Sequence, residues 1–503
     1  MFKKKLKEYI DANVPIIYIN SYDDNDMENC ILEVTGRRKV WEWNQMVGLV
    51  NRKDIQKEKV QSSQEILNDN ISIDEFLVSG VKEREFHRKV IILKDSTAYL
   101  DNLKTVALLK NACLSIERGD LDTVFVIISP IIRVPKELEK YIVILEEEYL
   151  SEDDIREMIL KFAYEHMAGN VYEKVLNKMV IAFKGLSTLE IETILSLAFS
   201  RNGELTEDAM EWIMEQKKQM IQKSGILEMV PIKESMDDIG GLNTLKEWLR
   251  KKSVILNDMS SAKKFGVELP KGVLIAGVLG CGKSLNAKAS AKLFGTPLLK
   301  LDMGRLMGKY VGESEQNMRQ AIAIAEAIAP CVLWIDELEK AFAGIGGNGG
   351  GAEVTTRLFG QFLTWMQEKE SAVFVVATAN DIMKLPPELM RKGRFDEIFY
   401  VKLPNQFERK KIFEIHIGKR RPDDLKEIDT SKLAEMTDGY SGADIEGVVK
   451  DAIEDAFVKG KTKITTEDIK KAISTTHSLK EIMGESISKL EKEYKERKFK
   501  SAS

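Results

Sequence analysis

The chain has 503 residues, of which 44% are hydrophobic and 31% charged, and its formal net charge is −5. These proportions are typical of a globular protein with a substantial core, and the length predicts two to four domains. The acidic balance argues against a dedicated nucleic-acid binder, which usually carries a basic excess, but leaves room for a local basic groove.

The four cysteines are scattered, without the CxxC or His/Cys spacing of a metal site, and are read as reduced thiols of a cytoplasmic protein. The apolar run at residues 14–19 is too short for a signal peptide and is interrupted by a proline. No apolar run is long enough to span a bilayer. The cysteines are Cys30, Cys113, Cys281 and Cys331.

Short apolar runs alternate with helical patterns in residues 1–150. Residues 1–12 have the spacing of an amphipathic helix, and the runs at 16–19, 89–95 and 124–129 have the β-branched composition of buried strands. Because strands that alternate with helices indicate a parallel sheet, this segment is predicted to be an α/β domain.

This first segment weakly repeats the second half of the chain. Residues 90–95 and 124–129 resemble 332–336 and 373–378, respectively. Where a phosphate-binding loop would follow the first strand, residues 21–26 carry three aspartates that would repel a triphosphate. We interpret the segment as a degenerate, nucleotide-free P-loop-like domain. The alternative is an unrelated α/β domain whose strands look similar by chance.

The next segment, residues 151–232, is predicted to be a helical, lid-like block that ends in a connector. Ser151 precedes three acidic residues, which is typical of a helix start. Residues 205–223 form a long polar helix candidate, and residues 225–236 are expected to link the two halves.

Residues Gly277–Ser284, here called the phosphate loop, fit the pattern GxxxxGK[S/T] between a strand-like run at 271–276 and a helix-like run at 285–294. In that context glycines let several backbone amides face one anion, and the helix N-terminus adds positive charge. Lys283 is expected to reach the β- and γ-phosphates, and Ser284 to hold Mg²⁺. A glycine-rich turn that matches by chance is the alternative.

Two later strands predict the rest of a phosphoryl-transfer site. Residues 331–337 end in Asp336 and Glu337, which a parallel sheet would place at its ligand-binding edge. Asp336 is expected to support Mg²⁺, and Glu337 to orient and deprotonate the attacking water. The strand at 373–380 ends in Asn380, which is expected to contact the γ-phosphate or the water. An acidic strand end at the surface is the alternative.

Arg391 and Arg394 do not obviously serve the phosphate loop of their own chain. A guanidinium that reaches the γ-phosphate of a neighbouring subunit would stabilise transition-state charge. This interpretation requires an oligomer with the site at its interface. Surface salt bridges to Glu388 or Asp396 are the alternative.

The order of these motifs resembles the AAA family of ATPases, within the AAA+ class, over about half the chain. The resemblance begins at residues 238–241 and ends at residues 439–444. It implies a P-loop parallel sheet in a large subdomain at 233–403 and a helical lid at 404–478, which leaves residues 479–503 as a polar tail. The phosphate loop lacks two prolines that are common in the family and has serine where threonine is common, but neither change removes a ligand.

The resemblance also implies which residues bind ATP. The glycine pair at 240–241 would let the backbone approach the adenine, although such a pair is more often only a loop. The motif at 439–444 lies on the lid in that family and touches the adenosine. The residues assigned to ATP are Asp238, Gly240, Gly280, Cys281, Gly282, Lys283, Ser284, Leu285, His416, Gly442 and Ala443.

A narrower resemblance covers nearly the whole chain. Residues 223–228, 330–337 and 363–369 look like the AAA proteins of the hypothetical chloroplast reading frame group, which pair a non-binding first half with one active ATPase module. This resemblance supplies no substrate.

Two loops bear on what hydrolysis would do. Residues 308–315 stand where AAA translocases have pore loop 1, so Lys309, Tyr310 and Val311 are expected to grip an extended polypeptide. The glycine-rich run at 343–352 resembles a mobile second pore loop. A packed loop tyrosine and a plain connector are the alternatives.

Residues 422–477 have a helical pattern with a capping start at Thr465. Residues 474–503 are charged and lack strong apolar periodicity, so a polar helix that frays into a disordered tail is expected.

Together the patterns predict an ATPase with ATP and Mg²⁺ as cofactors, assembled as a homohexameric ring that remodels or threads an unidentified protein partner. Two other functions stay open. The first is an ATP-gated scaffold with slow turnover, which would not need the water-activating Glu337. The second is a nucleic-acid motor, which the acidic balance and the lack of a basic–aromatic run disfavour.

Overall fold

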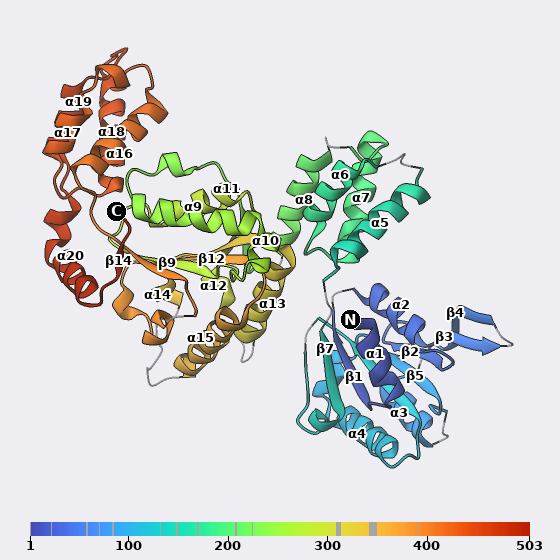
Figure 1. The fold of residues 1–503 in the computed structure, drawn as a ribbon. Helices are drawn as coiled ribbons and strands as arrows, with labels where there is room; N and C mark the ends of the chain where they lie inside the picture. Colours follow the sequence, from blue (N-terminus) through green and yellow to red (C-terminus); the bar gives the residue numbers. More distant parts are fainter. Residues whose placement is uncertain are drawn as a thin grey trace. The chain divides into compact units, whose positions relative to one another are not determined.

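The computed structural model describes residues 2–21, 23–56, 59–69, 71–82, 85–130, 132–146, 149–167, 171–206, 209–223, 225–307, 313–341, 350–391 and 393–503. The chain divides into two compact units (Figure 1). The first unit contains residues 1–154 with 186–197, and the second contains residues 155–185 with 198–503.

The first unit is a seven-stranded sheet with helices on both faces. Its strand order is β4-β3-β2-β5-β6-β1-β7, in which β2, β3 and β4 pair antiparallel and the others parallel. Helices α1 and α2 cover one face, and α3 and α4 the other. The strands are β1 Ile16–Asn20, β2 Lys39–Asn44, β3 Gly48–Gln56, β4 Lys59–Asn68, β5 Lys89–Leu93, β6 Thr123–Ile128 and β7 Ile142–Glu146. The helices are α1 Phe2–Asp11, α2 Asp24–Val34, α3 Ile73–Lys82 and α4 Leu103–Glu117.

The second unit is built on another seven-stranded sheet, in the order β14-β13-β9-β12-β11-β10-β8. Successive side chains along each strand point to opposite faces of the sheet and so pack into two different cores. Val273 packs with α9 and α11, whereas Leu274 packs with α13 and α15. The strands are β8 Leu227–Val230, β9 Gly272–Gly277, β10 Leu298–Leu301, β11 Cys331–Ile335, β12 Val373–Ala379, β13 Glu397–Val401 and β14 Lys500–Ser501. The helices on its faces are α9 Asn243–Asn257, α11 Lys283–Phe294, α13 Glu313–Ile328 and α15 Gly350–Glu368.

The two sheets share one strand order. Apart from the added edge strands, the first sheet reads β7-β1-β6-β5-β2 and the second reads β13-β9-β12-β11-β10. Numbered along the chain within each unit, both read fifth, first, fourth, third, second. The shared topology supports the interpretation of the first α/β domain as a relative of the second.

A helical bundle follows the second sheet and forms the lid. Helices α16, α17, α18 and α19 enclose a core of their own, in which Phe413, Leu433 and Val448 are buried. The predicted capping start at Thr465 is present, because its hydroxyl accepts a hydrogen bond from the Asp468 amide. The helices are α16 Gln406–Arg420, α17 Thr430–Met436, α18 Gly442–Val458 and α19 Thr466–Thr475.

The expectation that the chain ends in a disordered tail is wrong. Helix α20 spans Leu479–Glu496, and strand β14 adds to the edge of the second sheet beside β13. Tyr494 of α20 stacks on Tyr400 of β13 with ring centroids 3.8 Å apart. The amide of Ala502, which is fully buried, donates to the Tyr400 carbonyl at 2.9 Å. A few buried contacts fix this otherwise polar segment.

The segment predicted as a helical block is helical, and the connector after it contains a strand that the sequence did not reveal. Strand β8 pairs antiparallel with β10. Within the second unit, Lys184, directly after α6, donates from Nζ to the carbonyl of Ala329, which precedes β11, at 2.6 Å. The block comprises α5 Glu152–Glu165, α6 Glu173–Phe183, α7 Thr188–Asn202 and α8 Ala209–Lys223.

Several short helices complete the chain, and in the part that the structure describes no helix is long and apolar enough to cross a membrane. The short α-helices are α10 Met259–Lys264, α12 Met303–Leu306 and α14 Leu338–Ala341. The 3₁₀ helices are η1 Ser96–Asp101, η2 Glu139–Tyr141, η3 Met236–Asp238, η4 Ile382–Lys384, η5 Pro387–Met390 and η6 Leu425–Glu427.

Candidate nucleotide site

The phosphate loop joins the interior strand β9 to helix α11, as the sequence predicts. Gly280 and Gly282 have left-handed backbone angles, with φ of 70° and 81°. A Cβ atom at Gly280 would lie 2.8 Å from the Ser441 hydroxyl of the lid, so this position also needs glycine for space. The loop thus turns its amides toward the start of α11, where an anion is favoured.

Lys283 is 6% exposed and lies folded against its own loop. Its Nζ donates to the carbonyl oxygens of Gly277 at 2.9 Å and Val278 at 2.8 Å. Burial lowers the pKa of Lys283, and the negative charges of neighbours such as Asp336 oppose that effect. The Lys283 ammonium therefore lies beside the space where phosphates would bind.

A chain of hydrogen bonds joins the start of α11 to the ends of β11 and β12. Ser284 Oγ donates to Asp336 Oδ1 at 3.0 Å, and Thr378 Oγ1 donates to the same oxygen at 2.5 Å. The Thr378 hydroxyl in turn accepts from the Glu337 amide at 3.0 Å. No motif in the sequence indicated Thr378. It connects Ser284 and Asp336, the residues expected at Mg²⁺, to Glu337, the residue expected to activate water.

Glu337 has a left-handed backbone, with φ of 50°, directly after Asp336. Its carboxylate accepts from Asn380 Nδ2 at 3.1 Å and forms an ion pair with Lys340 Nζ at 2.6 Å. Because β11 and β12 pair in parallel, with Ile335 beside Ala377, the strand ends bring Glu337 and Asn380 together.

These groups face one cavity of about 380 Å³ between the large subdomain and the lid. The predicted residues that line it are Asp238, Gly240, Gly280, Cys281, Gly282, Lys283, Ser284, Leu285, Asp336, Glu337, Asn380, His416, Gly442 and Ala443. The structure therefore brings together every residue that was assigned to ATP or Mg²⁺.

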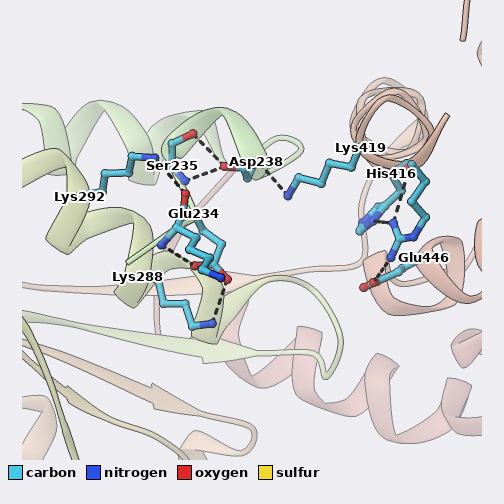
Figure 2. Close-up of polar contacts among 10 residues, drawn as sticks. Glu234, Ser235, Asp238, Lys288, Lys292, His416, Lys419 and Glu446 are labelled. Atoms are coloured by element: carbon cyan, nitrogen blue, oxygen red, sulfur yellow. Dashed lines mark hydrogen bonds and ion pairs between the residues drawn. The ribbon is translucent and has the colours of Figure 1, made fainter. Parts of the chain in front are cut away.

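The lid contributes charged residues that no motif indicated. Glu408 and Glu446 of the lid line the cavity, as does Lys402, which directly follows β13 in the large subdomain. Lys419 of α16 forms an ion pair with Asp238 at 2.7 Å, as Figure 2 shows. No motif indicated the pair of Lys419 with Asp238, because the contact between the lid and η3 arises in the tertiary fold.

Asp238 also forms a capping box with Ser235 at the N-terminus of η3. Its carboxylate accepts hydrogen bonds from the Ser235 amide at 2.7 Å and the Ser235 hydroxyl at 2.9 Å (Figure 2). Burial alone would raise the pKa of Asp238, but the hydrogen bonds from Lys419 and Ser235 lower it to about 2. Asp238 therefore stays ionised at physiological pH.

His416 lies in the lid wall of the cavity. Burial lowers its pKa, and the nearby Arg420 and Lys419 charges act in the same direction, whereas Glu446 opposes. A neutral imidazole at pH 7 can exchange hydrogen bonds with a sugar hydroxyl. A guanidinium nitrogen of Arg420 lies 3.3 Å from Nδ1 of the ring, and Arg420 pairs with Glu446 at 2.8 Å.

The residues present fit Mg²⁺. This ion keeps several waters and takes one or two carboxylates together with substrate phosphates, rather than an all-protein cage. The Ser284 hydroxyl and the Asp336 carboxylate, 3.0 Å apart at the end of the phosphate loop, supply such a donor set.

The two candidate arginines lie elsewhere. They follow η5, and neither is among the described residues that line the cavity. Arg391 is exposed, and a guanidinium nitrogen of Arg394 donates to the main-chain carbonyl of Glu388. The pore-loop candidates Lys309, Tyr310 and Val311 lie outside the described residues, as does most of the glycine-rich run at 343–352.

Comparison with protein-family models identifies the parts of the chain. A model of the ATPase family associated with various cellular activities (AAA) matches residues 273–403, and a model of the AAA+ lid domain matches 427–471. Models of the N-terminal and second domains of SpoVK-like AAA ATPases match residues 2–147 and 153–224.

Whole-chain relatives are also found. The chain is 36% identical over 493 residues to the uncharacterized AAA domain-containing protein ycf46 of Guillardia theta, covering 97% of this chain and 94% of that protein. It is 34% identical over 475 residues to the ycf46 protein of Pyropia yezoensis, covering 94% and 93%. The resemblance predicted from the motifs is confirmed: the chain belongs to the AAA family of ATPases, in the group of the ycf46 AAA domain-containing proteins.

Proposed function

We propose that the chain hydrolyses ATP with Mg²⁺. The observation that carries this proposal is that one cavity is faced both by the Ser284–Asp336 pair and by the Glu337–Asn380 pair. The first pair suits a metal shared with phosphates, and the second suits a water placed against the γ-phosphate. A protein that binds ATP without hydrolysing it would need only the Ser284–Asp336 pair.

Each residue has a defined part in the proposed reaction. Bound Mg²⁺ would neutralise charge that develops on the transferred phosphoryl group. Glu337 takes a proton from water as its oxygen attacks the γ-phosphorus and the bond to the β-phosphate oxygen breaks, which yields ADP and phosphate. Asn380 orients Glu337 and the γ-phosphate, and Lys283 leaves its loop carbonyls to bind the phosphates.

We further propose that the subunits form a homohexameric ring in which Arg391 and Arg394 complete the site of a neighbour. Support comes from their position, since both follow η5 and neither faces the cavity of its own chain. An arginine supplied from another subunit stabilises transition-state charge without contributing to ground-state binding in its own chain.

The proposed use of the energy is to remodel or thread a protein partner. This part rests on the sequence around Tyr310 and on family membership. The partner would be recruited, or the ring capped, by residues 1–150 and the helical block at 151–232. The module at 233–478 would hydrolyse ATP and drive the remodelling. A full-length Tyr310→Ala protein is expected to keep its ATPase activity and lose partner processing; equal processing would favour an ATP-gated scaffold.

The central test is Mg²⁺-dependent phosphate release by the full-length protein and its Glu337→Gln variant. Loss of a general base typically costs about 10²- to 10⁴-fold in turnover, whereas an amide of the same shape leaves nucleotide binding intact. Glu368→Gln, at the exposed end of α15, is the matched control. Equal turnover of wild type and Glu337→Gln would remove Glu337 from the mechanism.

A further inference from the structure

Two carboxylates hold Asn380, one in the cavity and one behind it. The side-chain amide donates to Glu337 Oε1 at 3.1 Å, and the backbone amide donates to Glu339 Oε1 at 3.0 Å. Glu337 is among the described residues that line the cavity, whereas Glu339 is 7% exposed and lies outside that lining. The hydrogen bond to the Asn380 amide therefore connects Glu339 to the residues that line the cavity.

The local chain path explains how two carboxylates so close in sequence face different ways. The left-handed turn at Glu337 redirects the chain into the short helix α14, which begins at Leu338. Glu339 then points toward the end of β12, where Asn380 is the first residue after the strand. The bond between Glu339 and Asn380 thus ties the ends of two neighbouring strands.

The second oxygen of Glu339 is unusual. Within the part of the chain that the structure describes, Oε2 is buried and makes no hydrogen bond. Buried polar atoms are nearly always paired, so an unpaired carboxylate oxygen has a cost that packing alone does not explain. The C-terminal helix approaches the same group: burial raises the pKa of Tyr494, and the Asp381 and Glu339 charges add to that effect.

We propose that Glu339 is a positioning residue for ATP hydrolysis, whose carboxylate fixes the backbone of Asn380 so that the Asn380 amide meets Glu337 and the γ-phosphate. This inference rests on the proposed function. Without the carboxylate the end of β12 loses its anchor at Asn380, whose side-chain amide donates to Glu337. A displacement of about 1 Å in such a group can cost about 10²-fold in rate.

The first experiment compares full-length Glu339→Ala and Glu339→Gln with wild type. Glu339→Ala is expected to lower kcat by about 10- to 100-fold and to leave the Kd of a fluorescent ATP analogue within about threefold. Glutamine keeps a carbonyl acceptor, so Glu339→Gln is expected to retain most of the turnover. Should Glu339→Ala fail to fold, Glu339→Met preserves the volume and removes the acceptor.

A double-mutant cycle separates positioning from general loosening. If Glu339 acts through Asn380, then Glu339→Ala adds no further loss of kcat to an Asn380→Ala protein. Losses that multiply would overturn the inference. Glu326→Ala is the matched control, because Glu326 accepts from Trp365 Nε1 and Ser371 Oγ, both at 2.9 Å, away from the cavity. An equal loss of kcat in Glu326→Ala would also overturn it.

The two proposals fail in different ways. A wild-type protein that binds the ATP analogue but releases no phosphate would overturn the proposed function and this inference together. A wild-type protein with normal turnover, matched by Glu339→Ala, would overturn the inference alone and leave the roles of Glu337 and Asn380 standing.

Discussion

Lys94 donates a hydrogen bond to Glu28 at 2.8 Å. In the topology of the two units, Lys94 occupies the position of Asp336, and Glu28 occupies the position of Ser284. Lys94 and Asp336 are each the first residue after the third parallel strand. Glu28 lies nine positions after Ile19, and Ser284 lies nine positions after Ile275. Ile19 pairs with Ile128, and Ile275 with Thr378, at equivalent places in the two sheets.

The pair belongs to a buried cluster of four charges. Arg52 Nε lies 2.7 Å from Glu28 Oε1 and 2.6 Å from Glu42 Oε2, and Lys94 Nζ lies 3.4 Å from Glu42. Glu42 is 1% exposed and Glu28 is 6% exposed. An internal cation thus satisfies the carboxylates at the place where the second unit offers a hydroxyl and a carboxylate to a metal.

The first prediction is that the full-length chain binds one nucleotide. Lys283→Ala should abolish binding of a fluorescent ATP analogue, because the cluster in the first unit leaves no place for a metal–phosphate group. Lys94→Met should keep the stoichiometry of one. It should also destabilise the first unit by about 3–5 kcal/mol, because two buried carboxylates lose a partner. Two nucleotides per wild-type chain, or residual binding in Lys283→Ala, would contradict this account.

The second prediction concerns the arginines. Arg391→Ala and Arg394→Ala should each lower kcat by at least about 100-fold with little change in ATP affinity, because an arginine finger acts in the transition state. A Lys283→Ala subunit has no working site but still offers its arginines. Mixing it with Arg391→Ala should therefore give faster phosphate release than either protein alone. Arg250→Ala, exposed on α9, is the control. Lack of rescue at every mixing ratio would refute the shared site.

The residues of the nucleotide site could be predicted from the sequence because each follows a strongly apolar strand or belongs to a motif of fixed spacing. β9, β11 and β12 are buried along their whole length, so their ends are easily located. Parallel pairing then brings these ends together, which is why Ser284, Asp336 and Asn380 meet.

Other features could not be predicted, because tertiary contacts determine them. Strand β8 has only four residues with a weak pattern, and its partner β10 is remote in sequence. The C-terminal segment is charged overall, and Tyr494 alone gives no sign that it stacks on Tyr400. The hydrogen bond between Glu339 and the Asn380 amide likewise depends on the left-handed turn at Glu337, which has no signal in the sequence.

The third prediction tests the bridge between Lys419 and Asp238, which joins the lid to the large subdomain beside the cavity (Figure 2). Exposed ion pairs contribute about 0–1 kcal/mol, so Lys419→Ala should weaken ADP binding by only about two- to fivefold and leave kcat nearly unchanged. The difference from wild type should vanish near 1 M salt, because exposed charges are then screened. Lys411→Ala, which breaks a pair with Glu414 within α16, is the control and should not change affinity. A salt-independent effect would argue against an electrostatic bridge.

The fourth prediction follows from Lys217 of α8, which is 1% exposed. Burial lowers its pKa to about 7, with Lys184 acting in the same direction and Cys331 opposing. The unfolded chain, with a lysine pKa of about 10.4, binds more protons than the folded chain between pH 7 and 10. Stability therefore rises with pH across that window, and the cost of burying the ammonium is fully present below pH 7.

For this group alone, the gain in the free energy of unfolding from pH 7 to 9 is about 2 kcal/mol. Lys217→Met keeps the apolar stem and removes the charge, so it should stabilise the second unit most at pH 7 and progressively less toward pH 9. Chemical denaturation of both proteins at the two pH values measures the difference. Lys218→Met, one position along the same helix and less buried, should show no such trend. A constant difference between wild type and Lys217→Met would mean that the lysine stays protonated in the folded protein, and that its ammonium group reaches water.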